Sequence, residues 1–194
     1  MEPVRMLQIL FSLEDGSVIE TVIIPCARGR TTICVSSQVG CAMNCQFCFT
    51  GRMGLRKHLS TAEIVEQAVF ARRLFSDELG SINNVVFMGM GEPFHNIDNV
   101  IKASAIMVDE QGLHFSPRKV TVSTSGLVPQ LKRFLQESNC SLAVSLNATT
   151  DEVVIILFFF FFFALGRPSA GGTHMSQVWE RIVSLFCKLT CFAG

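Results

Sequence analysis

The chain has 194 residues, which is enough for one domain with a substantial core but short for two. Its 16 Lys and Arg balance 16 Asp and Glu, so no overall charge favours nucleic acid or a membrane, and RNA contacts would need local basic patches. Eight cysteines behind a start that does not read as a secretory leader favour metal or thiol chemistry in a reducing compartment. We expect a cytoplasmic protein, or an organellar one if the source is eukaryotic, without membrane contact.

The first 30 residues predict a β-hairpin. The strand-like segments MLQILFSL and SVIETVII flank Glu14, Asp15 and Gly16, and a glycine tolerates the positive φ of a tight turn. Residues 1–30 are therefore assigned to a hairpin extension, and a further strand is predicted over 31–36.

That strand leads into three cysteines, Cys41, Cys45 and Cys48, spaced as CxxxCxxC. Three thiolates can hold a [4Fe-4S] cluster and leave its fourth iron open for a small molecule. S-adenosylmethionine (SAM), with adjacent amino and carboxylate groups, suits that vacancy. The alternative is a structural zinc site with Cys34 as fourth ligand, but such sites usually draw their ligands as two close pairs.

Strand and helix patterns alternate after the cysteines. Ser60 and Glu63 form a capping box that starts a helix. Short apolar strands are predicted over 84–88, 119–123 and 141–146, and helices over 97–110 and 129–137. This β-loop-α order predicts a parallel sheet with right-handed crossovers.

Each predicted strand ends in polar or glycine-rich residues. These are the cysteines, then Gly89 to Pro93, Ser123 to Gly126, and Ser145 to Asn147. In parallel sheets, sites lie where strands end and loops begin. The glycines at 89 and 91 are explained either by a plain turn or by a cofactor that touches the backbone. Beside the cysteines, we favour a cofactor site.

The sequence changes character at residue 153. Thirteen apolar residues, including six consecutive Phe, occupy 153–165, too few for the about 20 that span a bilayer. We treat 153–194 as a divergent tail outside the preceding fold.

Four segments together resemble a known family. TTICVSSQVGCAMNCQFCFTG, VVFMGMGEPFHNIDNV, KVTVSTSGLVP and AVSLNATTDE are similar, in order and spacing, to the radical SAM RNA methyltransferases of the RlmN/Cfr family, and more so to the RlmN branch, which methylates C2 of adenine. The resemblance covers about residues 7–153. It implies an α/β fold, a partial (β/α)₆ radical SAM barrel that is incomplete in this chain, with 31–152 as its core.

The resemblance also implies the cofactors and their ligands. Cys41, Cys45 and Cys48 would bind a [4Fe-4S] cluster, and SAM would bind its open iron. The residues that would contact SAM are Gly91, Glu92, Ser123, Ser145, Leu146 and Asn147.

Two further residues match catalytic positions of the family. Glu20 matches a proton-handling glutamate, and Cys34 matches the thiol that resolves a protein–RNA crosslink. The implied reaction uses two SAM molecules: one methylates a late cysteine, and the other yields a radical that activates this methyl group for addition to adenine. The implied substrate is 23S ribosomal RNA, with transfer RNA as a second one. The other implied partner is an electron donor such as flavodoxin or ferredoxin, and the protein would be a monomer.

The chain also departs from the family pattern. After Val153 the last barrel strands and the methyl-carrying cysteine have no matching positions, and Cys187 and Cys191 lack the expected glycine-rich context. We also expect no counterpart of the family's N-terminal RNA-gripping domain in these residues. We therefore expect an inactive fragment of such an enzyme. The alternatives are a Cfr-like enzyme that methylates C8, or a non-catalytic fragment that binds an iron–sulfur cluster, SAM or zinc.

Overall fold

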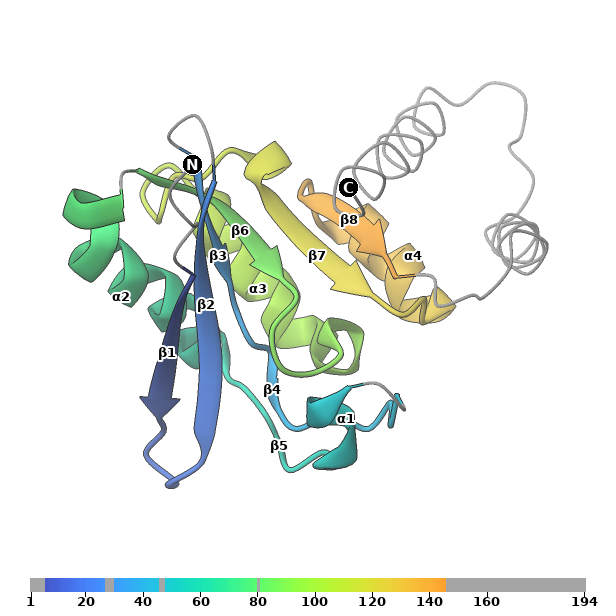
Figure 1. Ribbon diagram of the computed structural model, residues 1–194. Coiled ribbons are helices and arrows are strands. Elements are labelled where there is room, and N and C mark those ends of the chain that lie inside the picture. Colours follow the sequence, from blue (N-terminus) through green and yellow to red (C-terminus); the bar gives the residue numbers. More distant parts are fainter. Residues whose placement is uncertain (1–5, 27–29, 46–47, 80, 146–194) are drawn as a thin grey trace, which may run out of the picture.

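The computed structural model describes residues 6–26, 30–45, 48–79 and 81–145 (Figure 1). These residues form a six-stranded sheet in the order β1-β2-β3-β6-β7-β8. Its strands are β1 (Leu7–Ser12), β2 (Val18–Cys26), β3 (Arg30–Cys34), β6 (Ile82–Phe87), β7 (Val120–Thr124) and β8 (Ser141–Val144). The first three pair antiparallel, and β3, β6, β7 and β8 pair parallel. The prediction of a parallel sheet extended by an N-terminal hairpin is confirmed.

Three helices connect the parallel strands in turn and lie on one face of the sheet (Figure 1). They are α2 (Thr61–Leu79), α3 (Ile97–Val108) and α4 (Val128–Glu137). Shorter elements are α1 (Phe49–Arg52), the 3₁₀ turns η1 (Pro93–Asn96) and η2 (Pro117–Lys119), and a small ladder of β4 (Gln38–Val39) with β5 (Lys57–His58). No described helix is long and apolar enough to cross a membrane.

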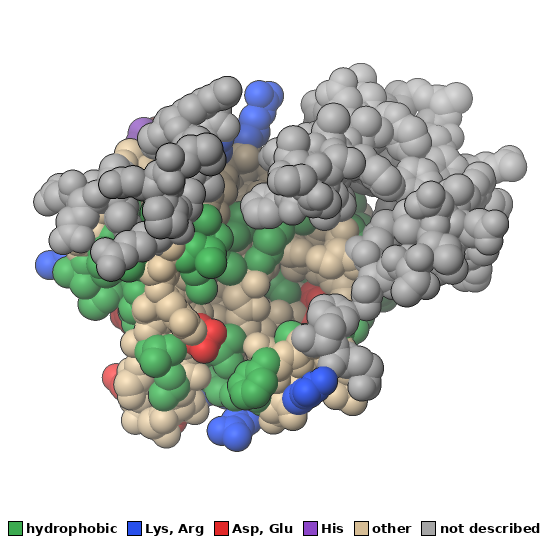
Figure 2. Space-filling view, viewed as in Figure 1, with side chains coloured by type: hydrophobic (Ala, Val, Ile, Leu, Met, Phe, Trp, Pro, Cys, Tyr) green, Lys and Arg blue, Asp and Glu red, His purple; other side chains and the backbone are tan. Residues whose placement is uncertain are grey.

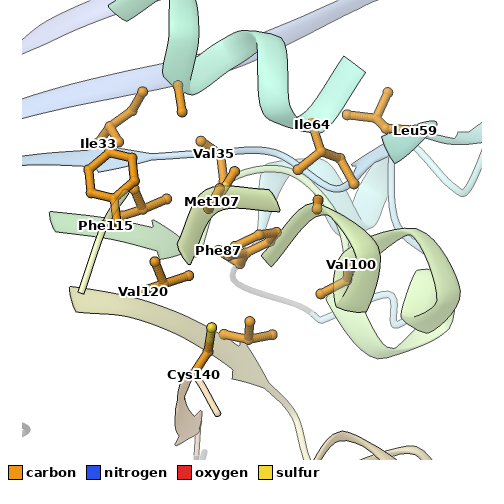
Figure 3. Close-up of a cluster of buried hydrophobic side chains, with 14 of the residues drawn as sticks. Ile33, Val35, Leu59, Ile64, Phe87, Val100, Met107, Phe115, Val120 and Cys140 are labelled. Atoms are coloured by element: carbon orange, nitrogen blue, oxygen red, sulfur yellow. The ribbon is translucent and has the colours of Figure 1, made fainter. Parts of the chain in front are cut away.

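The core lies between the sheet and these helices (Figure 3). Ile33 on β3, Phe87 on β6 and Val120 on β7 point toward Val100 and Met107 on α3, and all five are at most 1% exposed. Alternate residues of each strand face this layer because successive side chains of a strand point to opposite faces. The helical crossovers therefore bury the middle of one face of the sheet.

The other face of the sheet is only partly covered in the described residues. Val22, Cys34, Val86 and Thr121 lie side by side on it, as the strand registers place them, and all are half-buried. The side of the molecule shown in Figure 2 carries hydrophobic side chains among polar ones. In the barrel that the family resemblance implies, this face would be the interior.

The hairpin turn is fastened to the start of α2 by Lys57. Its ammonium lies 2.7 Å from Asp15 in the turn and 2.8 Å from Glu63 on α2. The hydrogen bond from Lys57 lowers the pKa of Asp15 to about 2. The predicted capping box is confirmed, because Ser60 Oγ accepts from the Glu63 amide and Glu63 accepts from the Ser60 amide.

Candidate functional site

The structure places the four predicted strand ends at one rim of the sheet. The segment after β3 contacts the segment after β6, since the Ser37 amide donates to Met90 O at 2.9 Å and the Gly89 amide to Val35 O at 3.1 Å. Across the neighbouring pair, the Ser145 amide donates to Thr124 O at 2.8 Å. The loop with the cysteines and the glycine-rich loop are therefore immediate neighbours.

The three cysteines of the motif lie in the loop that follows β4. Cys41 is buried, and Cys45 and Cys48 are half-buried. Burial raises the pKa of the Cys41 thiol, and the nearby Glu92, Cys45 and Cys48 act in the same direction. Within the described residues no three metal-binding side chains are arranged to hold a metal ion, and residues 46–47 of this loop lie outside the description.

The base of the cysteine loop is closed by a contact between two glycines. Gly40 has φ +74°, and a Cβ atom there would lie 1.8 Å from the carbonyl oxygen of Gly54. The Arg56 amide donates to Val39 O at 2.9 Å and extends the β4–β5 pairing. Residues 40 and 54 can therefore approach only because residue 40 has no side chain.

Gly91 must also be a glycine, because it packs against the side chain of Gln38. Its φ is +100°, and a Cβ atom would lie 2.5 Å from Gln38 Cβ. This packing against Gln38 adds a third explanation to the two that the sequence left open, a plain turn and a cofactor contact.

Glu92 is 5% exposed and binds backbone amides with both carboxylate oxygens. Oε1 accepts from the Phe94 amide at 3.0 Å, and Oε2 accepts from the Ser125 amide at 2.8 Å. The carboxylate thus joins the start of η1 to the loop after β7. Ser125 Oγ in turn lies 3.8 Å from the sulfur of Met43, in the cysteine loop.

The remaining predicted SAM contacts lie along the same rim where they are described. Ser123 Oγ and Ser145 Oγ are 3.0 Å apart at the ends of β7 and β8. Leu146 and Asn147 lie outside the described residues.

Glu20 and Cys34 lie on the sheet face away from the helices. Cys34 is opposite Val22 in the β2–β3 register, and Glu20 is two residues from Val22, so both side chains are on one face and diagonal to each other. Glu20 is exposed. Burial raises the pKa of Cys34 to about 11, although a backbone hydrogen bond from Met88 opposes the shift. Cys34 is therefore a neutral thiol at pH 7.

Sequence reasoning missed two buried glutamines that support this rim. Gln67 on α2 accepts from Thr21 Oγ1 and from the Ser36 amide, and it donates to Ser36 O. Gln38, which is fully buried, accepts from the Glu92 amide at 2.7 Å. A run of three polar residues, Ser36, Ser37 and Gln38, between a strand and a cysteine motif is the signal that would have indicated such a role.

Comparison with known proteins identifies the family. The model of the radical SAM superfamily matches residues 35–189. The chain belongs to the radical SAM superfamily. Membership implies a [4Fe-4S] cluster and SAM, and the residues present fit both groups. Three soft thiol donors lie in one partly buried loop, directly beside a glycine-rich loop.

Curated relatives of the chain are named RNA methyltransferases. The chain is 56% identical over 144 residues to "Dual-specificity RNA methyltransferase RlmN" of Syntrophotalea carbinolica, a match that covers 74% of this chain and 38% of that protein. It is 57% identical over 145 residues to the protein of the same name from Pelobacter propionicus, covering 74% and 40%. The chain thus spans about two fifths of the length of the curated relatives it matches.

A solved structure supports the fold. A radical SAM methyltransferase from Sphaerobacter thermophilus superimposes with a TM-score of 0.71 and 39% sequence identity, over 85% of this chain and 55% of that one. The α/β architecture, read as part of a radical SAM barrel, agrees with this similarity.

Proposed function

We propose that this chain carries the part of a radical SAM RNA methyltransferase that binds the cluster and SAM. The proposed reaction is methylation of C2 of adenine in 23S ribosomal RNA, with transfer RNA as a second substrate. One observation supports it above all. The segment that leads into the CxxxCxxC motif is hydrogen-bonded to the loop of Gly91 and Glu92, and 144 residues of this chain are 56% identical to a dual-specificity RNA methyltransferase.

In this proposal, Cys41, Cys45 and Cys48 hold the cluster. C2 of adenine is electron-poor and cannot take a methyl group from a sulfonium ion. When bound, the cluster and SAM would supply a radical that activates a methyl group for this addition. The backbone and carboxylate around Gly91 and Glu92 would orient the methionine part of SAM. The remaining contacts would come from Ser123, Ser145, Leu146 and Asn147.

Glu20 and Cys34 would handle the proton and the crosslink to RNA. Both lie on the sheet face that corresponds to a barrel interior, where an adenine would have to enter. The half-buried thiol of Cys34 is neutral at pH 7 and must lose its proton before it can act as a nucleophile. The exposed Glu20 carboxylate on the same face is the group we propose to move protons there.

We further propose an electron donor such as flavodoxin or ferredoxin, a monomeric state, and a cytoplasmic location. The C8-methylating reaction would differ only in its product. Nucleoside analysis of RNA treated with a full-length relative would separate 2-methyladenosine from 8-methyladenosine.

The direct test is anaerobic reconstitution of the chain with iron and sulfide. We expect about four irons per chain, as a [4Fe-4S] cluster requires, and a change in the electron paramagnetic resonance spectrum of the reduced cluster when SAM is added. Cys41→Ala should abolish iron binding, whereas Cys34→Ala, the matched control, should retain it. Stoichiometric zinc, or iron binding that depends on Cys34 and not on Cys41, would contradict the proposal.

A further inference from the structure

Gln38 connects the two loops of the candidate site through its side chain. The residue lies in β4, three positions before Cys41, and is fully buried. Its Oε1 accepts from the Glu92 amide at 2.7 Å, while its own backbone amide donates to Met90 O at 3.1 Å. One residue at the base of the cysteine loop thus binds the glycine-rich loop twice.

The orientation of the Gln38 amide is fixed by its two partners. A backbone N–H can only donate, so Oε1 must face Glu92, and Nε2 must then donate to its other neighbour. That neighbour is Nδ1 of His58 on β5, at 2.9 Å. His58 must therefore accept at Nδ1 and carry its own proton on Nε2.

The shape of the glycine-rich loop depends on the same side chain. Gly91 packs so closely on Gln38 that a Cβ atom would lie within 2.7 Å of Cβ, Cγ and Oε1 of the glutamine. The carboxylate of the next residue, Glu92, accepts hydrogen bonds from the Phe94 and Ser125 amides. A shift of the Gln38 amide would move this whole arrangement.

We propose that Gln38 is a positioning residue. Its side-chain amide, held between the Glu92 amide and His58, sets the place of Gly91 and Glu92 relative to the cysteine loop and so the geometry in which SAM binds. This inference rests on the proposed function, because it takes Gly91 and Glu92 as part of the SAM site. The opposing explanation is that Gln38 only fills volume.

Gln38→Met separates the two explanations, since methionine has similar length but cannot replace the amide hydrogen bonds. In the full chain, reconstituted anaerobically, we expect unchanged iron content and about 10-fold weaker SAM binding, because the Glu92 amide loses its buried acceptor. The matched control is Asn84→Ala, which removes another side-chain hydrogen bond in the sheet, to Thr32 Oγ1, away from the two loops. It should leave SAM binding unchanged.

A second readout does not depend on SAM. Nitrogen NMR of histidine-labelled chain should show His58 as the Nε2–H tautomer in the parent and as a mixture of tautomers in Gln38→Met. A residue that merely filled space would leave the tautomer unchanged. If Gln38→Met fails to fold, His58→Ala, at an exposed position, should still weaken SAM binding, and unchanged binding there would overturn the proposal.

The outcomes distinguish this inference from the function on which it rests. If the parent binds SAM and Gln38→Met binds it equally well, the positioning role is wrong and the proposed function stands. If the reconstituted parent itself binds no SAM, the proposed function fails and this inference fails with it.

Discussion

Glu92, at the rim of the sheet, has hydrogen-bond partners within the protein in addition to its proposed contact with SAM. The family resemblance implies that Glu92 contacts SAM. In the structure each oxygen already accepts a backbone amide, one from η1 and one from the loop after β7. A carboxylate oxygen can accept a second hydrogen bond, so a contact with SAM is compatible with this arrangement. The carboxylate therefore has a structural role in addition to the proposed one.

This dual role predicts that Glu92→Gln destabilises the chain even without SAM. The new NH₂ group would face a backbone N–H, which leaves two donors opposed in a buried place. We expect a loss of about 1–3 kcal/mol in the free energy of unfolding, measured by urea denaturation of the chain without cofactors. Glu137→Gln, at an exposed ion pair with Arg133, is the control and should change little. Equal stability of parent and Glu92→Gln would leave only a ligand role for Glu92.

Cys34 predicts a pH dependence of stability. Its pKa is about 11 in the folded chain, raised by burial from an ordinary value of 9.0. Above pH 9 the unfolded chain loses this proton while the folded chain keeps it, so stability falls as pH rises from about 9 to 11. The total is on the order of 2 kcal/mol. Unfolding of reduced parent and Cys34→Ser, compared between pH 8 and 10.5, should show a steeper decline in the parent, and parallel curves would contradict the assignment.

At the scale of elements, regular patterns were predictable and short pairings were not. The capping box located the start of α2, and apolar spacing located α3 and α4 to within two residues. The ladder of β4 and β5 escaped prediction because strands of two residues show no period. It nevertheless closes the base of the cysteine loop. The contacts that position the candidate site thus arise where the sequence has the least local signal.

The packing of α3 on the sheet predicts losses of stability of very different size at two adjacent residues. Phe87, at the end of β6, is 1% exposed and packs under α3, whereas Met88 is 52% exposed. Phe87→Ala should therefore cost about 3–5 kcal/mol of stability, and Met88→Ala should cost far less. Thermal unfolding followed by circular dichroism measures both. A larger effect at Met88 would mean that a further part of the chain covers this side of the sheet.

For the whole molecule, the order of strands and helices along the chain was enough to predict the sheet topology. It also predicted that the strand ends lie at one rim of the sheet. Parallel strands joined by helical crossovers bring their carboxyl ends to one rim, and this rule placed the cysteines near Gly91 and Ser123. It could not show that Gln38, Glu92 and Ser125 form a connected chain of hydrogen bonds, because such partners depend on loop conformation. Leu146, Asn147 and the segment 153–194 lie outside the described residues, so those predictions stay predictions.

We predict that this chain does not methylate RNA, whereas a full-length relative would. Turnover needs a methyl-carrying cysteine within bonding reach of adenine, and Cys187 and Cys191 lie in a sequence without the glycine-rich context of that cysteine. Misplacement by about an ångström can cost on the order of 100-fold in rate. Incubation of the reconstituted chain with SAM, a reductant and unmodified ribosomal RNA should therefore give no 2-methyladenosine after digestion to nucleosides, while an RlmN protein treated alike gives it. Catalytic formation of 2-methyladenosine by this chain would overturn the expectation and point to one of the two late cysteines as the carrier. Loss of that product in Cys187→Ala or Cys191→Ala would then identify which one.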